Sequence, residues 1–341
     1  MSKAGKILSV NPSRAVPGGE VFIECENFEI SSENEYGCYF DGQKARLVGA
    51  SNDRLIAIVP ENFDTTEVEL HLETSGLRSD SVQILVGKKL ADEMHIVANP
   101  AVDPQDDSII LTRSGSRGQQ LPVTLFRLEA DGYLQEIPAD VLNPTGIAFD
   151  RDGQMFVTGR ADGEVYRING EGEAVSSVSG VGVATGLAFD KNGGMFIGDR
   201  SGIIYRVSNF DIAEPFGTLE PSVSAYHLAF SAQGDLYVSA PGLSSHDSIY
   251  SFDASGDESE FYRGLGRPQG LAFDREGNLY AAACLNSRRG IVKISPKKEA
   301  EIFVAGMNVV GLCFTRKGEM IVATNEAIYS LPLGIQGILL D

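Results

Sequence analysis

Large and small apolar residues alternate in a short phrase that recurs along most of the chain. Each copy ends its apolar run on a phenylalanine, and these phenylalanines stand 40, 41, 43 and 41 residues apart. Alternation with a period of two predicts a β-strand, and self-similarity at about 40 residues predicts one small antiparallel sheet per repeat. The copies read PTGIAFDRDGQMFV (144–157), ATGLAFDKNGGMFI (184–197), AYHLAFSAQGDLYV (225–238), PQGLAFDREGNLYA (268–281) and VVGLCFTRKGEMIV (309–322).

A degenerate sixth copy precedes these five. It reads ANPAVDPQDDSII (98–110) and puts Val102 in the phenylalanine column. Further strand-like runs follow each phrase, so each copy predicts one blade, and six radial blades make a six-bladed β-propeller. We assign this propeller to residues 89–341. We expect a strand from one end of the chain to close the ring, either 88–94 or the final GILLD.

Residues 1–88 carry a different pattern, in which short alternating strands are separated by glycine and proline turns. Such a pattern predicts an immunoglobulin-like sandwich, so we expect the whole chain to be all-β. The region resembles the TIG/IPT family in ILSVNPSRAVPGGEVFIECENF (7–28), CYFDGQKARLVGASNDRLIAIVPE (38–61) and EVELHLETSGLRSDSVQILV (67–86). That resemblance implies a spacer, adhesion or dimerisation module, and it names no ligand.

Two of the four cysteines, Cys25 and Cys38, fall on neighbouring predicted strands in core-facing phase. A disulfide between them would fit an exported protein, whereas buried free thiols fit a reducing compartment. The first residues, MSKAGKILSV, lack the apolar stretch of a secretory leader. We therefore expect a cytoplasmic protein with free thiols, and export only if the natural chain begins further upstream.

The chain is acidic, with a formal net charge of −19 at pH 7. This charge repels a phosphate backbone and excludes nucleic acid as a partner. No apolar run of about 20 residues is present, so we predict no membrane span. We expect a monomer whose partner is another protein or an anionic small ligand.

The repeat region resembles NHL-repeat proteins and the gluconolactonase-like six-bladed propellers. Gluconolactonase-type enzymes hold a divalent metal with carboxylates four residues before the aromatic column. In this chain that column contains no carboxylate, and the phrase that carries an acid in the family reads Pro268-Gln269-Gly270. A hard cation prefers several oxygen ligands that include carboxylates, so we predict no metal, no cofactor and no catalytic residue. The column reads Ala98, Thr145, Thr185, Tyr226, Gln269 and Val310.

The repeat also predicts where a binding site lies. In an antiparallel blade, the start of the inner strand and the loop between the second and third strands lie at the same mouth of the channel. We call this end the strand-start mouth. The second-to-third-strand loops that vary in length are 113–122, 240–248 and 284–290, and variable loops on a rigid scaffold favour binding. Candidate ligand contacts here are Asn99, Thr145, Thr185, Tyr226 and Gln269.

Histidines and arginines add candidates at this mouth. His227 and Asn99 stand where the other blades keep glycine, and His246 lies in a variable loop. A histidine can act as a base or a donor, while the alternative is a hydrogen-bonded imidazole that fills the channel wall. Arginine side chains at this mouth would suit an anionic ligand. The alternative is that they are surface residues that bond turn carbonyls. The arginines are Arg113, Arg160, Arg200 and Arg288.

From the sequence we therefore predict a non-catalytic binding or scaffold protein that uses the strand-start mouth. The alternative is a gluconolactonase-like hydrolase or lyase with a diverged metal site, and only that alternative would require a divalent cation.

Overall fold

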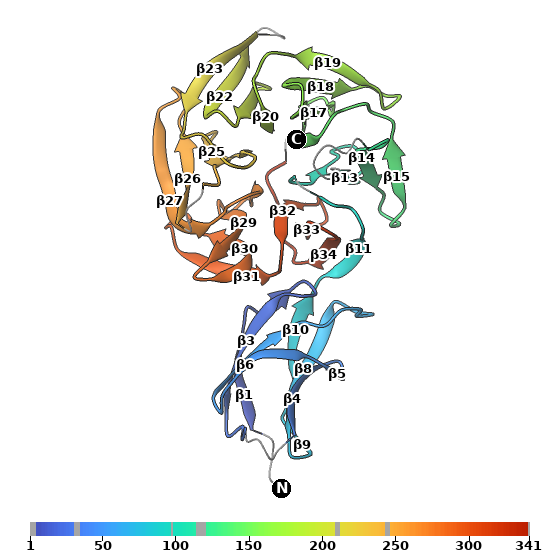
Figure 1. The fold of residues 1–341 in the computed structure, drawn as a ribbon, viewed down its shortest axis with the longest axis vertical. Helices are drawn as coiled ribbons and strands as arrows, with labels where there is room; N and C mark the ends of the chain where they lie inside the picture. The colour runs from blue at the N-terminus through green and yellow to red at the C-terminus, as the bar shows by residue number, and fades with distance from the viewer. Residues whose placement is uncertain are drawn as a thin grey trace.

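The computed structural model describes residues 5–30, 35–96, 98–113, 121–208, 212–242 and 246–339. Every regular element within these ranges is a β-strand, and none is a helix. The all-β prediction is confirmed. In Figure 1, blades of antiparallel strands form a ring, and a second body of strands lies against one side of the ring.

Blades 1 to 3 are separate four-stranded antiparallel sheets, each running outward from the channel in chain order. Hairpins therefore join every pair of neighbours, and the starts of the inner strands share one mouth with the second hairpin loops. Blade 1 comprises β12 (Ala101–Val102), β13 (Ile109–Thr112), β14 (Leu125–Leu128) and β15 (Leu134–Ile137). Blade 2 comprises β16 (Pro144–Phe149), β17 (Met155–Gly159), β18 (Glu164–Ile168) and β19 (Ala174–Val178). Blade 3 comprises β20 (Ala184–Phe189), β21 (Met195–Asp199), β22 (Ile203–Ser208) and β23 (Ile212–Thr218).

Blades 4 and 5 are joined into one sheet. The outer strand of blade 4 is long enough to pair with the second strand of blade 5, through Leu265 with Leu285 and Gly266 with Cys284. Blade 4 comprises β24 (His227–Phe230), β25 (Leu236–Ser239), β26 (Asp247–Phe252) and β27 (Glu258–Gly266). Blade 5 comprises β28 (Leu271–Phe273), β29 (Leu279–Leu285), β30 (Arg288–Ile294) and β31 (Ala300–Ala305).

Blade 6 closes the ring with strands from both ends of the propeller. Its strands are β32 (Val309–Phe314), β33 (Glu319–Thr324), β34 (Ile328–Pro332) and β11 (Lys88–Ala91), with β11 antiparallel to β34 on the outer edge. Of the two closing segments left open by the sequence, the one that begins at Lys88 joins the blade. The C-terminal segment instead turns into the ring, where Ile338 donates its backbone N–H to Phe273 O at 3.0 Å.

The second body holds the first ten strands in two sheets that share one core. One sheet has the order β1 (Lys6–Asn11), β3 (Glu20–Glu26), β7 (Arg54–Ile58), β6 (Arg46–Ala50). The other runs from β2 (Arg14–Ala15) through β10 (Val82–Val86), β8 (Glu67–Thr74) and β4 (Tyr36–Phe40) to β5 (Gln43–Lys44), and β9 (Leu77–Arg78) pairs with β8. Ile23 and Leu55 of the first sheet pack in the same buried cluster as Phe40 and Leu70 of the second.

Cys25 and Cys38 lie in this shared core as free thiols. Burial, reinforced by Asp53, raises the pKa of Cys25 to about 11, and burial also raises the pKa of Cys38. Both thiols are therefore protonated and act as small apolar core residues.

Candidate functional site

The strand-start mouth carries a cavity of about 540 Å³ between blades 5 and 6. This size lies within the range of about 300–1,000 Å³ that is usual for small-molecule sites. Its walls are glycine, alanine and valine, apart from six residues with polar side chains or a thiol. These are Arg267, Gln269, Cys284, Arg289, Asn308 and Asn325.

Strand ends position these side chains. Gln269 precedes β28 and donates its backbone N–H to Ala282 O at 2.8 Å, which fixes it against β29. Across the cavity, Asn325 donates its backbone N–H to Asn308 O at 3.0 Å. The amide side chains of the two blades therefore stand on hydrogen-bonded backbone around the opening.

Arg267 is held in an unusual backbone conformation. Its φ is +48°, in the left-handed region that non-glycine residues adopt rarely and at some energetic cost. The following Pro268 disfavours the right-handed helical region at this position, and the Arg267 N–H donates to the Asp247 carboxylate at 3.2 Å. Asp247 is only 7% exposed, so this carboxylate fixes the Arg267 backbone from beneath the surface.

The cavity is cationic on an acidic protein. Two arginines line it, and none of its described lining residues is Asp, Glu or His. Arginines offer several N–H donors in a planar fork that matches a carboxylate or phosphate, and amides supply both donors and acceptors. The arrangement can bind an anionic group together with neighbouring hydroxyl groups.

Of the residues proposed from the sequence, Gln269 lines this cavity, as do Cys284, Arg289 and Gly290 of the loop at 284–290. Within the other two loops, 114–120 and 243–245 lie outside the described residues. The remaining candidate side chains are placed elsewhere.

Thr145 and Thr185 are buried and bond the neighbouring blade instead of facing a ligand. The Thr145 hydroxyl lies 3.0 Å from the Thr158 hydroxyl and donates to Ala184 O at 3.3 Å. Thr185 accepts the backbone N–H of Tyr226 at 3.1 Å. These hydroxyls join blade 2 to blade 3 and blade 3 to blade 4.

Tyr226 and His227 are also buried. Tyr226 is fully enclosed, its hydroxyl donates to Glu220 O, and burial is the main reason why its pKa is raised to about 12. Burial lowers the pKa of His227 to about 4, so the imidazole is neutral near neutral pH. His246, by contrast, is exposed at the rim of blade 4. We therefore no longer place Thr145, Thr185, Tyr226 or His227 among the ligand contacts.

Asn99 has a structural role at the ring closure. Its amide oxygen accepts the Leu312 N–H at 2.9 Å, and its amide nitrogen donates to Leu271 O at 3.3 Å. A Cβ atom on Gly311 would lie 2.6 Å from the Asn99 oxygen, so this glycine leaves the space that the asparagine fills. The sequence predicted a side chain at this place in the channel wall, and its contacts link blades 1, 5 and 6.

The four arginines fall into two groups. Arg113 is exposed and Arg160 and Arg200 are half-buried on blades 1 to 3, away from the cavity. Burial, together with the nearby Arg200, lowers the pKa of Arg160, and Arg200 Nη2 donates to Val223 O at 3.2 Å. Arg288 is turned to the second body, where Nη1 donates to Asn11 Oδ1 at 3.2 Å. Its placement as a ligand contact is corrected, because strand alternation gives the cavity to Arg289 instead.

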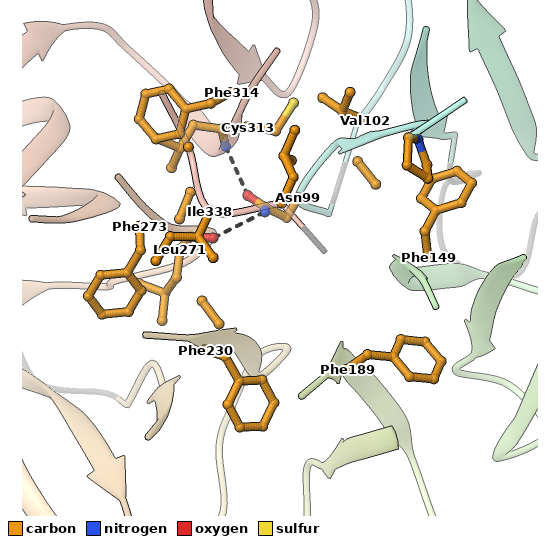
Figure 2. Close-up of a pocket in the computed structure, with 17 residues that line it drawn as sticks. Asn99, Val102, Phe149, Phe189, Phe230, Leu271, Phe273, Cys313, Phe314 and Ile338 are labelled. Atoms are coloured by element: carbon orange, nitrogen blue, oxygen red, sulfur yellow. Dashed lines mark hydrogen bonds between the residues drawn. The ribbon is translucent and has the colours of Figure 1, made fainter. Parts of the chain in front are cut away.

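A second cavity, of about 210 Å³, lies inside the channel. Figure 2 shows the repeated phenylalanines spaced around it, with Ile338 of the C-terminal segment against Leu271. Asn99 is its one polar lining side chain among the described residues, and that amide is already hydrogen-bonded on both atoms. This chamber is therefore an apolar compartment with few groups to orient a polar ligand.

Within the described ranges, no three His, Cys, Asp or Glu side chains converge in a way that would hold a metal ion. No helix of the described chain is long and apolar enough to cross a membrane.

Sequence reasoning missed Arg267, Asn308 and Asn325, and it did not single out Cys284 within the predicted loop 284–290. The available signal lay two residues before the column of Gln269, where Arg267 aligns with Asn143, Val183 and Ser224 of other blades. Asn325 carries no such signal, because it lies in a turn outside the repeated phrase.

No family model matches the chain, and no curated protein matches its sequence. Solved structures do match. An auxiliary nutrient binding protein from Bacteroides thetaiotaomicron is 13% identical, with 96% of this chain and 98% of that chain covered and a TM-score of 0.56. A gluconolactonase from Xanthomonas campestris is 17% identical over 72% of this chain and 88% of that chain, with a TM-score of 0.59. Virginiamycin B lyase from Staphylococcus aureus is 14% identical over 72% of this chain and 97% of that chain, with a TM-score of 0.52.

These likenesses show the fold. The repeat region is a β-propeller of the kind found in gluconolactonase-like and lyase structures. At such low identity the fold carries no activity with it.

Proposed function

We propose that the protein is a non-catalytic binding protein whose cavity between blades 5 and 6 takes a small polyhydroxylated anion. The observation that carries the proposal is the lining, two arginines and three amide side chains with no carboxylate among the described lining residues. The arginines would hold the acid group, and Gln269, Asn308 and Asn325 would bond hydroxyl groups. A sugar acid has this combination of groups.

Two further observations support binding over catalysis. Among its described lining residues the cavity offers no histidine or carboxylate that could move a proton, and burial lowers the pKa of His227 to about 4. The auxiliary nutrient binding protein from Bacteroides thetaiotaomicron, a structural neighbour, matches nearly the whole chain. We further propose that the protein has no resident cofactor and that it is a monomer.

We also propose that residues 1–88 form a TIG-like immunoglobulin module and that residues 89–341 form the NHL-like propeller. In this proposal the module is a structural partner of the propeller. A partner protein that docks at the same mouth through an acidic group would use the same arginines. The reducing compartment stays our expectation, in keeping with the free thiols of the core.

The test is calorimetric titration of the whole protein with D-gluconate, with neutral D-glucose as the matched control. We expect gluconate to bind and glucose to bind at least about tenfold more weakly, since charge-assisted hydrogen bonds contribute about 1.5–3 kcal/mol each. Replacing both cavity arginines (Arg267→Gln with Arg289→Gln) should abolish gluconate binding. Arg316→Gln, on an exposed turn at the opposite mouth, is the charge control. Equal affinity in both variants would overturn the proposal.

The alternative function is lactone hydrolysis or a lyase reaction, which the likeness to gluconolactonase and lyase structures favours. This reaction would require a divalent cation. If calcium, zinc or manganese raised the melting temperature and supported turnover of a lactone, the alternative would replace the binding function.

A further inference from the structure

The second body and the propeller bury residues in each other's cores. Ala15 pairs in parallel with Ala305 of β31, and the Val16 N–H donates to Ala305 O at 2.9 Å. Val16, fully buried, packs in the cluster of blades 5 and 6, while Ala305 packs in the core of the second body. One sheet therefore runs from blades 4 and 5 into the second body.

Two arginines cross this junction in opposite directions. Arg14 of the second body lies over the Phe303 ring of β31, at 4.3 Å from its centroid. Arg288 of β30 lies over the Phe22 ring of β3 at 4.2 Å, and its guanidinium also donates to Asn11. Each contact joins a cation to an aromatic face of the other body, an attraction that grows as the pair loses water.

The two arginines differ in what stands beside them. Arg288 begins β30, and the next residue is Arg289 of the cavity. Successive side chains of a strand point to opposite faces. Arg288 therefore faces the second body, and Arg289 faces the cavity. Arg289 also pairs across the hairpin with Cys284, a second lining residue. Arg14 has no such neighbour in the cavity lining.

A second connection runs through Gly306. Its N–H donates to Arg289 O at 3.1 Å. A Cβ atom placed on it would lie 2.7 Å from a methyl of Val309, which lines the cavity, and 2.9 Å from a methyl of Val16. The second body thus approaches the cavity wall as closely as a glycine allows.

We propose that the second body positions the cavity. By anchoring Arg288, it fixes the start of β30 and thereby the guanidinium of Arg289 and the hairpin that carries Cys284. The inference rests on the proposed function, since it assigns a control of that same site. Arg288 is a positioning residue, because it contacts Asn11 and Phe22 and is absent from the cavity lining.

The experiment compares Arg288→Ala with Arg14→Ala in the full chain. Each variant removes one cation over one ring, and Arg288→Ala also removes the hydrogen bonds to Asn11. Arg14→Ala should therefore lower the unfolding midpoint by about 2–4 °C, and Arg288→Ala by somewhat more. Only Arg288→Ala should weaken gluconate binding, by about two- to thirtyfold, the usual range for coupling through a packed junction. Equal losses of affinity in both variants, or no loss in Arg288→Ala, would overturn the proposal.

A readout without ligand separates this inference from the proposed function. Cys284 is partly exposed, whereas the other three cysteines are buried, so an aromatic disulfide reagent labels Cys284 first in the native protein. We expect faster labelling in Arg288→Ala and an unchanged rate in Arg14→Ala. If the labelling differs in this way while wild-type protein does not bind gluconate, the coupling between the second body and the cavity holds and the proposed ligand is wrong. If gluconate binds and labelling is alike in both variants, the coupling is wrong.

Asn11→Ala keeps the experiment decisive if Arg288→Ala fails to fold. It removes the side-chain acceptor of Arg288 and leaves the ring contact in place. It should shift Cys284 labelling in the same direction by a smaller factor, and an unchanged rate would count against the proposal.

Discussion

The contact between blades 2 and 3 and the contact between blades 5 and 6 use the same column of the repeat in opposite ways. Between blades 2 and 3, Thr145 and Thr158 bond each other and the facing strand, and the contact is closed. Between blades 5 and 6 the column holds Gln269 and Val310, and a cavity of about 540 Å³ opens. Short hydroxyl side chains thus bridge the contact between blades 2 and 3, whereas the contact that lacks them borders a cavity.

The open contact is held at its other end by the C-terminal segment. Gln336 O accepts the Arg275 N–H at 2.9 Å, and Ile335 donates its N–H to Gly318 O at 3.1 Å, so the segment ties the turns of blades 5 and 6. Deletion of residues 335–341 should cost the largest amount of stability, about 3–5 kcal/mol, from the lost apolar burial and hydrogen bonds. Chemical denaturation would measure it, and a cost below about 1 kcal/mol would show that blades 5 and 6 need no such tie.

Lower pH should weaken the closed part of the ring through His227. Its pKa is lowered by burial from 6.5 to about 4, so between these values the unfolded chain binds a proton that the folded protein does not. The contribution of neutral His227 to the free energy of unfolding is complete above pH 6.5. It is lost as the pH falls towards 4, by about 3 kcal/mol in all. Denaturation midpoints of wild type and His227→Gln across this window test it. Identical pH profiles would mean that His227 is solvated.

Replacing Thr158 by valine should open the contact between blades 2 and 3. The Thr158 hydroxyl accepts the Gly146 N–H at 2.7 Å, and valine would leave that partly buried donor without this partner. We expect a loss of about 1–3 kcal/mol in the free energy of unfolding. Thr65→Val, which loses a solvent-exposed hydroxyl bond, is the matched control.

The smallest effect should come from the open contact. Asn325→Ala removes a side chain that lines the cavity, so stability should change by less than about 0.5 kcal/mol. Gluconate binding should weaken at the same time. A large loss of stability would show that Asn325 stabilises the contact between blades 5 and 6, as Thr158 does for the contact between blades 2 and 3.

The sequence was sufficient for the propeller because the alternation and the period are local properties of each blade. It was insufficient for the site because contacts between blades decide which polar side chains stay free. Thr185 and Gln269 occupy one column, yet only Gln269 lines a cavity. Arg288 and Arg289 are neighbours on one strand and point to opposite faces, and only the contact of Arg288 with the second body shows that Arg289 is the one at the cavity.

Closure by β11 has a consequence for the order of events during synthesis. The strand leaves the ribosome directly after the second body, but its partner β34 emerges only after all the other blades have been made. Strand β11 therefore lacks its partner strand for most of translation, and contacts of such long sequence separation form slowly. The early body, complete by Val86, can fold meanwhile and hold that edge beside the place where the last blade will arrive.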